Sequence, residues 1–210
     1  MSENNVIAFS NASNLPSDPA ALANLGVAAS TMATAGDGVD ILRLLRDGAW
    51  VFGAENIEPE EDSRWAINPY SFKHGHIAWA DSKVHGEIMV PIMQPMPPRS
   101  ELGDAPEGWS EQISFLLQCV GGEDEGQVVE FKTTSVGGKR AATKMATSIS
   151  GQAQENPEYV VPVIVLNTDS YQHKKYGKIY TPIFDIAEWA SIGDATDKVE
   201  AKPEGRKRSR

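Results

Sequence analysis

Four basic residues surround a glycine pair in the stretch "KTTSVGGKRAATKMATSIS": Lys132, Lys139, Arg140 and Lys144. A glycine turn that opens a helix leaves the first N–H groups of that helix free for an anion, and nearby cations strengthen the attraction. The stretch therefore predicts contacts to phosphate groups. It is not a standard nucleotide-binding P-loop, because Arg140 stands where that motif needs Ser or Thr. The alternative is a glycine turn that leads into a helix with a solvated basic side.

A second segment, "SYQHKKYGKIY", interleaves aromatic and basic residues. Tyrosines stack on bases and lysines contact phosphates, which is how proteins hold single strands with little sequence preference. The alternative is a hairpin loop whose lysines keep a sheet edge soluble. The residues predicted to bind nucleic acid here are Tyr171, Lys174, Lys175, Tyr176 and Lys178.

A third segment, "RWAINPYSFKHGHIAWA", is rich in aromatic residues. Trp65 and Trp79 are expected in the core. The segment also predicts a second stacking platform, made of Tyr70, Phe72 and Lys73.

Patterns typical of catalysis or metal binding are weak in this chain. His74, His76 and His85 lack an Asp, Glu or Cys at a recognised metal-binding spacing, so we expect them to be structural. A G-x-S-x-G nucleophile motif is absent. The carboxylates that could serve a metal-dependent nuclease fall in an apparent loop, without a matching lysine motif: Glu55, Glu58 and Asp62. We therefore expect neither an enzyme nor a cofactor.

The formal net charge of −10 argues against a protein that coats duplex DNA by bulk charge. The charge is uneven, however, because residues 101–127 carry seven acidic and no basic residues, whereas residues 132–178 carry seven basic and three acidic ones. The single cysteine, Cys119, lies in an apolar run and fits a buried position in a reducing, cytosolic setting. The sequence contains neither a secretory signal nor an apolar run near the ~20 residues of a membrane helix.

Composition divides the chain into three parts. Residues 1–38 lack Lys and Arg and hold one of the sixteen aromatic residues, so they predict a flexible arm. Residues 191–210 lack aromatic residues, end in "GRKRSR" and predict a flexible tail. The folded domain is expected over residues 45–190.

Hydrophobic periodicity predicts a mainly β domain with one helix. Residues 40–48 predict at most a short amphipathic helix, and residues 167–177 a turn or long hairpin loop. Residues 75–80 and 84–93 form either one long bent strand or a hairpin. Further strands are expected at 109–120 and 128–134, then a helix at 138–154 and strands at 159–166 and 178–189. The order β-β-β-α-β-β is that of an OB-fold, a small Greek-key barrel that binds oligonucleotides.

The region from Trp50 to Trp189 resembles uncharacterised proteins of bacteriophages and prophages, on the pieces "WAINPYSF", "TTSVGGKRAA" and "SYQHKKYGKIYTPIFDIAEW". It is similar to phage single-stranded DNA-binding proteins in its OB-like order and in its mixture of aromatic and basic residues. The resemblance implies no catalytic residue.

These features predict a non-enzymatic binder of single-stranded DNA in phage replication or recombination. Its expected partners are single-stranded DNA and phage replication or recombination proteins, in the cytoplasm of a bacterial host. One alternative is an interaction protein whose acidic loops at 101–127 mimic the charge of a nucleic acid and inhibit a host defence factor. The other is the metal-dependent nuclease considered above.

Overall fold

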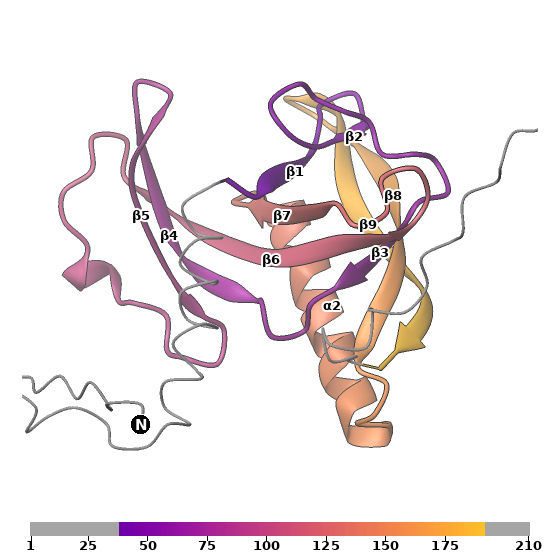
Figure 1. Ribbon diagram of the computed structural model, residues 1–210. Coiled ribbons are helices and arrows are strands. Elements are labelled where there is room, and N and C mark those ends of the chain that lie inside the picture. Colours follow the sequence, from indigo (N-terminus) through magenta and orange to yellow (C-terminus); the bar gives the residue numbers. More distant parts are fainter. Residues whose placement is uncertain (1–37, 192–210) are drawn as a thin grey trace, which may run out of the picture. The chain divides into compact units, whose positions relative to one another are not determined.

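The computed structural model describes residues 38–191. The predicted arm (1–38) and tail (191–210) lie outside the described residues, apart from their boundary residues Gly38 and Ser191. The described part is mainly β with one α-helix, as predicted (Figure 1). Its strands are β1 (Asp40–Leu44), β2 (Trp50–Val51), β3 (Arg64–Ile67), β4 (Lys73–Ala80), β5 (Lys83–Pro91), β6 (Trp109–Gly121), β7 (Val128–Thr133), β8 (Val161–His173) and β9 (Gly177–Ala190). Its helical elements are a short 3-10 turn (Arg99–Glu101) and helix α2 (Val136–Glu155).

The long strand β6 lies at the centre of the sheet (Figure 1). It pairs along one edge with β7, and its other edge is shared by two strands. The first part of that edge, residues 109–114, pairs with β4, and the second part, residues 117–121, pairs with β3. Strand β5 extends the sheet beyond β4. Phe115 of β6 and its partner Phe131 of β7 face the core together.

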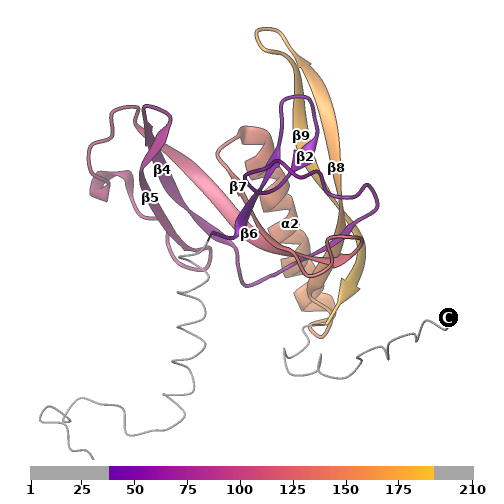
Figure 2. The same cartoon turned by 45° about the horizontal axis from the view of Figure 1, so that its top comes forward.

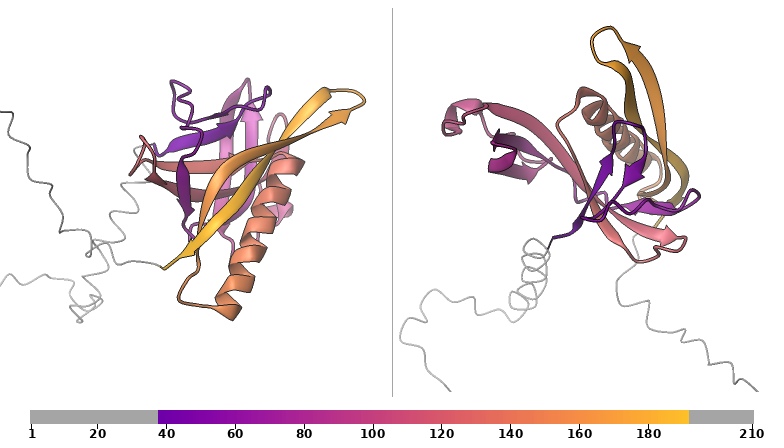
Figure 3. Two further views of the ribbon diagram at one scale, coloured as in Figure 1. Left: turned by 90° about the vertical axis from the view of Figure 1, so that its right-hand side faces the viewer. Right: turned by 90° about the horizontal axis from the view of Figure 1, so that it is seen from above.

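The sheet continues from β3 through β8 to β9. Strands β8 and β9 form a long hairpin that pairs from Val161 and Ala190 to His173 and Gly177, and its tip rises beyond the neighbouring strands (Figure 2). One edge of β9 has no strand partner within residues 38–191, and α2 runs along it (Figure 3). Strand β1 pairs in parallel with β7 and also approaches β9, so the sheet curls into a half-barrel.

A cluster of aromatic rings fills the half-barrel. The ring of Phe115 lies 4.7 Å from that of Phe72, 5.3 Å from that of Phe131 and 5.4 Å from that of Phe184, measured between centroids. Met145 of α2 is buried in the same core. Aromatic pairs of this kind contribute about 0.5–1.5 kcal/mol each beyond the area that they bury. The core therefore fixes β9 against β7 and α2.

Packing and a cap explain how α2 begins. Ser135 is the N-cap, and its hydroxyl accepts the N–H of Gly138 at 3.0 Å. A Cβ atom on Gly137 would lie 2.6 Å from Cγ2 of Thr181, and one on Gly138 would lie 2.3 Å from Oγ1 of Thr133. Only glycines allow the helix to approach β7 and β9 this closely. The N–H of Gly138 therefore donates to Ser135, whereas the sequence analysis expected the first N–H groups of this helix to bind phosphate.

Two features of the fold before α2 differ from the prediction. Residues 40–44 form strand β1 and not the start of a helix, because Leu42 is fully buried and the segment pairs in parallel with β7. A helix of this length is marginal without tertiary contacts, whereas the ladder satisfies the backbone. Seven strands precede α2 where three were predicted, while the two strands after it agree with the prediction.

The hairpins also refine the prediction. Residues 73–91 form the hairpin β4–β5, which was one of the two alternatives. Most of residues 167–177, predicted as a loop, belong to β8, and only residues 174–176 form the turn. Trp65 is fully buried as expected, whereas Trp79 is 41% exposed and its predicted burial is wrong.

Candidate nucleic-acid interface

Two adjoining hollows follow the edge of β9 that lies beside α2 and β1. The first, about 490 Å³, lies between α2 and β9 and is also lined by Tyr171. The second, about 740 Å³, lies between the start of β9, the end of β7 and the end of β1. Pro182 lines both. We call the two hollows together the β9 groove.

The β9 groove is basic, although the whole chain has a net charge of −10. Asp185 is the one carboxylate among its lining residues. Six basic residues are among those that line it: Arg43, Arg46, Lys132, Arg140, Lys144 and Lys178. Within residues 38–191, no carboxylate lies at ion-pair distance from Arg46, Arg140, Lys144 or Lys178. A hollow whose lining carries several unpaired cations and a single carboxylate attracts anions.

The tip of the β8–β9 hairpin presents exposed tyrosines beside this charge. Tyr171 is 51% and Tyr176 66% exposed. The ring of His173 stacks on that of Tyr176 with centroids 4.8 Å apart, and Nδ1 of His173 accepts the N–H of Lys175 at 3.1 Å. Lys178 lies 4.6 Å above the ring of Tyr180. The tip therefore offers aromatic faces whose positions are held by local contacts.

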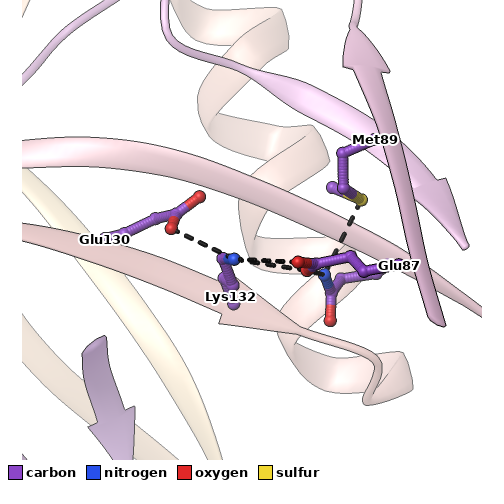
Figure 4. Close-up of polar contacts among 5 residues, drawn as sticks. Glu87, Met89, Glu130 and Lys132 are labelled. Atoms are coloured by element: carbon purple, nitrogen blue, oxygen red, sulfur yellow. Dashed lines mark hydrogen bonds and ion pairs between the residues drawn. The ribbon is translucent and has the colours of Figure 1, made fainter. Parts of the chain in front are cut away.

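Lys132 lines the groove, but its charge is balanced. Figure 4 shows the side chain between two carboxylates, with Nζ 3.2 Å from Oε1 of Glu87 and 3.3 Å from Oε2 of Glu130. Partial burial alone would lower the pKa of Lys132, but Glu130 and Glu87 outweigh it and raise the pKa above its ordinary value. Lys132 is therefore a weaker candidate for phosphate contact than its neighbours.

Lys139 is also paired. Its Nζ lies 3.1 Å from Oε2 of Glu111, and Arg99 adds a contact of 3.8 Å to the same carboxylate. The hydrogen bond and charge of Lys139, together with Arg99, hold the pKa of Glu111 below its ordinary value. The sequence interpretation grouped Lys139 with Arg140 and Lys144, whereas only Arg140 and Lys144 line the β9 groove.

The other predicted residues lie apart from the groove lining. Lys174 and Lys175 are exposed in the turn at the hairpin tip. Tyr70 is 80% exposed in the turn before β4, and Lys73 is exposed at the start of β4. Phe72 is 3% exposed and stacks on Phe115, so it is a core residue and its predicted role in base stacking is wrong.

The predicted site did not include the charged groove residues Arg43, Arg46 and Asp185, and it left out Tyr180, although that tyrosine lies in the aromatic and basic segment. Both arginines fall in the stretch predicted as a short helix, which hid their place at the end of β1 beside β7 and β9. Arg43 is partly engaged, since its guanidinium donates to the backbone oxygen of Gly53 and to Oδ1 of Asn56. The alternation along 178–189 could have placed Tyr180 on one strand face, but not beside an arginine.

The histidines hold a loop. Nε2 of His74 bonds the backbone oxygen of Gln94 at 2.8 Å, and Nε2 of His76 bonds that of Pro97 at 2.9 Å, so both attach the proline-rich loop to β4. Cys119 is buried, and burial raises the pKa of its thiol. In the described part of the chain, no group of three or more His, Cys, Asp or Glu side chains is placed to hold a metal ion, the nuclease candidates Glu55, Glu58 and Asp62 included.

Comparison of the chain with models of protein families, with curated proteins and with solved structures gave no match. Between residues 38 and 191, no helix combines the length and apolar character needed to cross a bilayer.

Proposed function

We propose that this chain binds single-stranded DNA along the β9 groove, without catalysis, in phage replication or recombination inside a bacterial host. The observation that carries the proposal is the groove itself, where Arg46, Arg140, Lys144 and Lys178, which have no ion pair within residues 38–191, line the same edge as exposed tyrosines. Cations that neutralise phosphates release counterions, which drives binding to nucleic acids.

The aromatic residues favour single strands over duplex. Tyr171 and Tyr176 can stack only on bases that are unpaired and turned outward, and such stacking is worth about 1–3 kcal/mol per base. The rest of the chain is acidic, which disfavours the broad phosphate contact that a duplex requires.

The strand pairings support the finer interpretation of the fold as OB-like. If β1 and β2 are set aside, β3 and β4 are taken as one bent strand and β5 as an insertion, the order becomes bent strand, β6, β7, α2, β8, β9. Strand β3 pairs with both β6 and β8, β6 pairs with β7, and β8 pairs with β9. This arrangement suits a partly open Greek-key barrel, in which the loop between the last two strands contacts the oligonucleotide. That loop is the tip of the β8–β9 hairpin.

The test is a titration of the full chain against a labelled poly-dT strand and a duplex of equal length, followed by fluorescence anisotropy over a salt series. We expect tighter binding to the single strand and a logarithm of affinity that falls linearly with the logarithm of salt concentration. Equal affinity for the duplex, or a flat salt response, would contradict the proposal, and so would the absence of binding to either.

A second candidate is the protein-interaction role. It is favoured by the contact between two acidic loops, where Oε2 of Glu60 accepts the backbone N–H of Glu123 at 2.9 Å. The loops at 58–62 and 123–125 thereby join into one acidic surface, which suits a basic protein partner. A chain that ignores all nucleic acids in the titration, but protects a nucleic-acid-binding host protein from its ligand, would favour this role.

A further inference from the structure

The hollow between α2 and β9 combines an apolar floor with a charged rim. Met145, Pro182 and Phe184 are buried and form part of the floor, whereas Arg140 and Lys144 stand on the α2 side of the rim. These two cations are four residues apart on α2, so they share one face of the helix. The volume of about 490 Å³ is that of a small-ligand site. An apolar slot flanked by cations suits a planar base that carries a phosphate.

Asp185 needs an explanation, because a carboxylate in a basic groove repels phosphate. Its position is fixed, since Nδ2 of Asn167 donates to its Oδ2 at 2.6 Å. The backbone oxygen of Asn167 in turn accepts Nε1–H of the buried Trp50 at 3.2 Å. Among the described residues, none donates a hydrogen bond to Oδ1 of Asp185. Asn167 thus orients a carboxylate at the rim that keeps acceptor capacity on Oδ1.

We propose that this hollow takes one guanine base of the bound strand, with Asp185 as the residue that selects it. The inference rests on the proposed function. The Watson–Crick edge of guanine carries two adjacent donors, N1–H and N2–H, which match the two oxygens of a carboxylate. Adenine and cytosine pair a donor with an acceptor on that edge, and thymine flanks its single donor with two acceptors, so each would leave an acceptor facing the carboxylate.

The neighbouring residues complete the site. Tyr171 lines the same hollow and is half exposed, so its ring can stack on the base or on the next one along the strand. Arg140 and Lys144 lie on the opposite wall, where they can hold the phosphates on either side of that nucleotide. The lone acidic residue then supplies base preference, and the cations supply affinity.

The experiment compares poly-dT strands in which isolated thymidines are replaced by guanosine, adenosine or cytidine, each titrated with the full chain. The variant is Asp185→Asn, which keeps the shape but replaces one acceptor by a donor. The matched control is Asp169→Asn, since Asp169 is exposed on β8 and does not line the hollow. Thermal unfolding checks that both variants remain folded.

We expect the wild type and Asp169→Asn to prefer the guanosine-containing strand by about tenfold, the order of one bidentate contact, and Asp185→Asn to lose that preference. Equal affinity of the wild type for all four strands would overturn this inference and leave the proposed function standing. A guanosine preference that survives in Asp185→Asn would overturn the role of Asp185. Absence of binding to every strand would overturn the proposed function and this inference together.

Discussion

The hairpins β4–β5 and β8–β9 both carry lysines and exposed aromatic residues, but the cations of β7 and α2 that lie near them are paired differently. Around β4–β5, carboxylates capture the nearby cations, since Glu87 binds Lys132 and Glu111 of the adjoining strand β6 binds Lys139. Beside β8–β9, Arg140, Lys144 and Lys178 form no ion pair within residues 38–191. Surrounding residues, more than local composition, therefore decide which cations can meet a phosphate.

Among substitutions that compare the two hairpins, replacement of the tyrosines is expected to change the affinity for poly-dT most. Tyr171→Ala and Tyr176→Ala should each weaken binding to poly-dT by about 1–3 kcal/mol, because each removes a ring on which a base can stack. The effect is read from anisotropy titrations at one salt concentration. Tyr70→Ala is the control, since Tyr70 is 80% exposed but lies before β4. A loss with Tyr70→Ala equal to that with Tyr176→Ala would move the binding face toward β4–β5.

Charge removal should give the next largest effect. The double variant Arg140→Ala with Lys144→Ala should lower the salt slope by about 1.4, that is about 0.7 for each lost contact to a single strand, and reduce affinity roughly 25-fold near 0.1 M salt. The matched control is Lys73→Ala with Lys83→Ala, which removes the same charge from β4–β5. Stability should change little in either variant, because these side chains are exposed. Equal slopes for the two double variants would refute a binding site confined to the groove.

The sequence was sufficient to predict those helices and strands whose own residues show clear hydrophobic periodicity. Helix α2 and the strands β6, β7 and β9 have strong periodicity, and each was placed within a few residues. Strand β1 could not be predicted, because its stability comes from a parallel partner about 90 residues later in the chain. Five predicted site residues, Arg140, Lys144, Tyr171, Tyr176 and Lys178, line the groove, along with the balanced Lys132.

The remaining discrepancies have the same cause. The sequence places the aromatic residue Phe72 just after a turn, but it does not reveal that its ring stacks on that of Phe115. The sequence shows that Lys132 and Lys139 are basic. It does not show that Glu87 of β5 pairs with Lys132, or that Glu111 of β6 pairs with Lys139 of α2. Both pairs join elements that are far apart in the chain, so they depend on tertiary packing that local periodicity does not describe.

The smallest expected effect concerns Lys132, which lines the groove but is paired with Glu87 of β5 and Glu130 of β7. Lys132→Met should weaken binding to poly-dT by less than about threefold, below the roughly fivefold expected for one unpaired phosphate contact near 0.1 M salt. Glu87→Gln should act in the opposite direction, because it releases Lys132 from one of its two partners and removes a negative charge near the groove. A fall in affinity with Lys132→Met as large as that with Lys144→Ala would mean that the strand displaces Glu87 and Glu130.

Stability against pH provides an independent measurement of the same pairing. The pKa of Lys132 is higher in the folded chain than its ordinary value, so its ion pairs stabilise the fold below the unfolded pKa of about 10.4 and lose that effect as pH rises through the folded pKa. The wild type should therefore exceed Lys132→Met in unfolding free energy by under about 1 kcal/mol at neutral pH, because the pair is partly exposed. That difference should stay constant to about pH 9 and narrow above about pH 10.5 in urea titrations.

Because the other lysines and tyrosines titrate in both proteins, their contributions cancel in the comparison. A difference that does not change with pH would mean that Lys132 stabilises the sheet through its methylene groups, leaving its ammonium available to a phosphate.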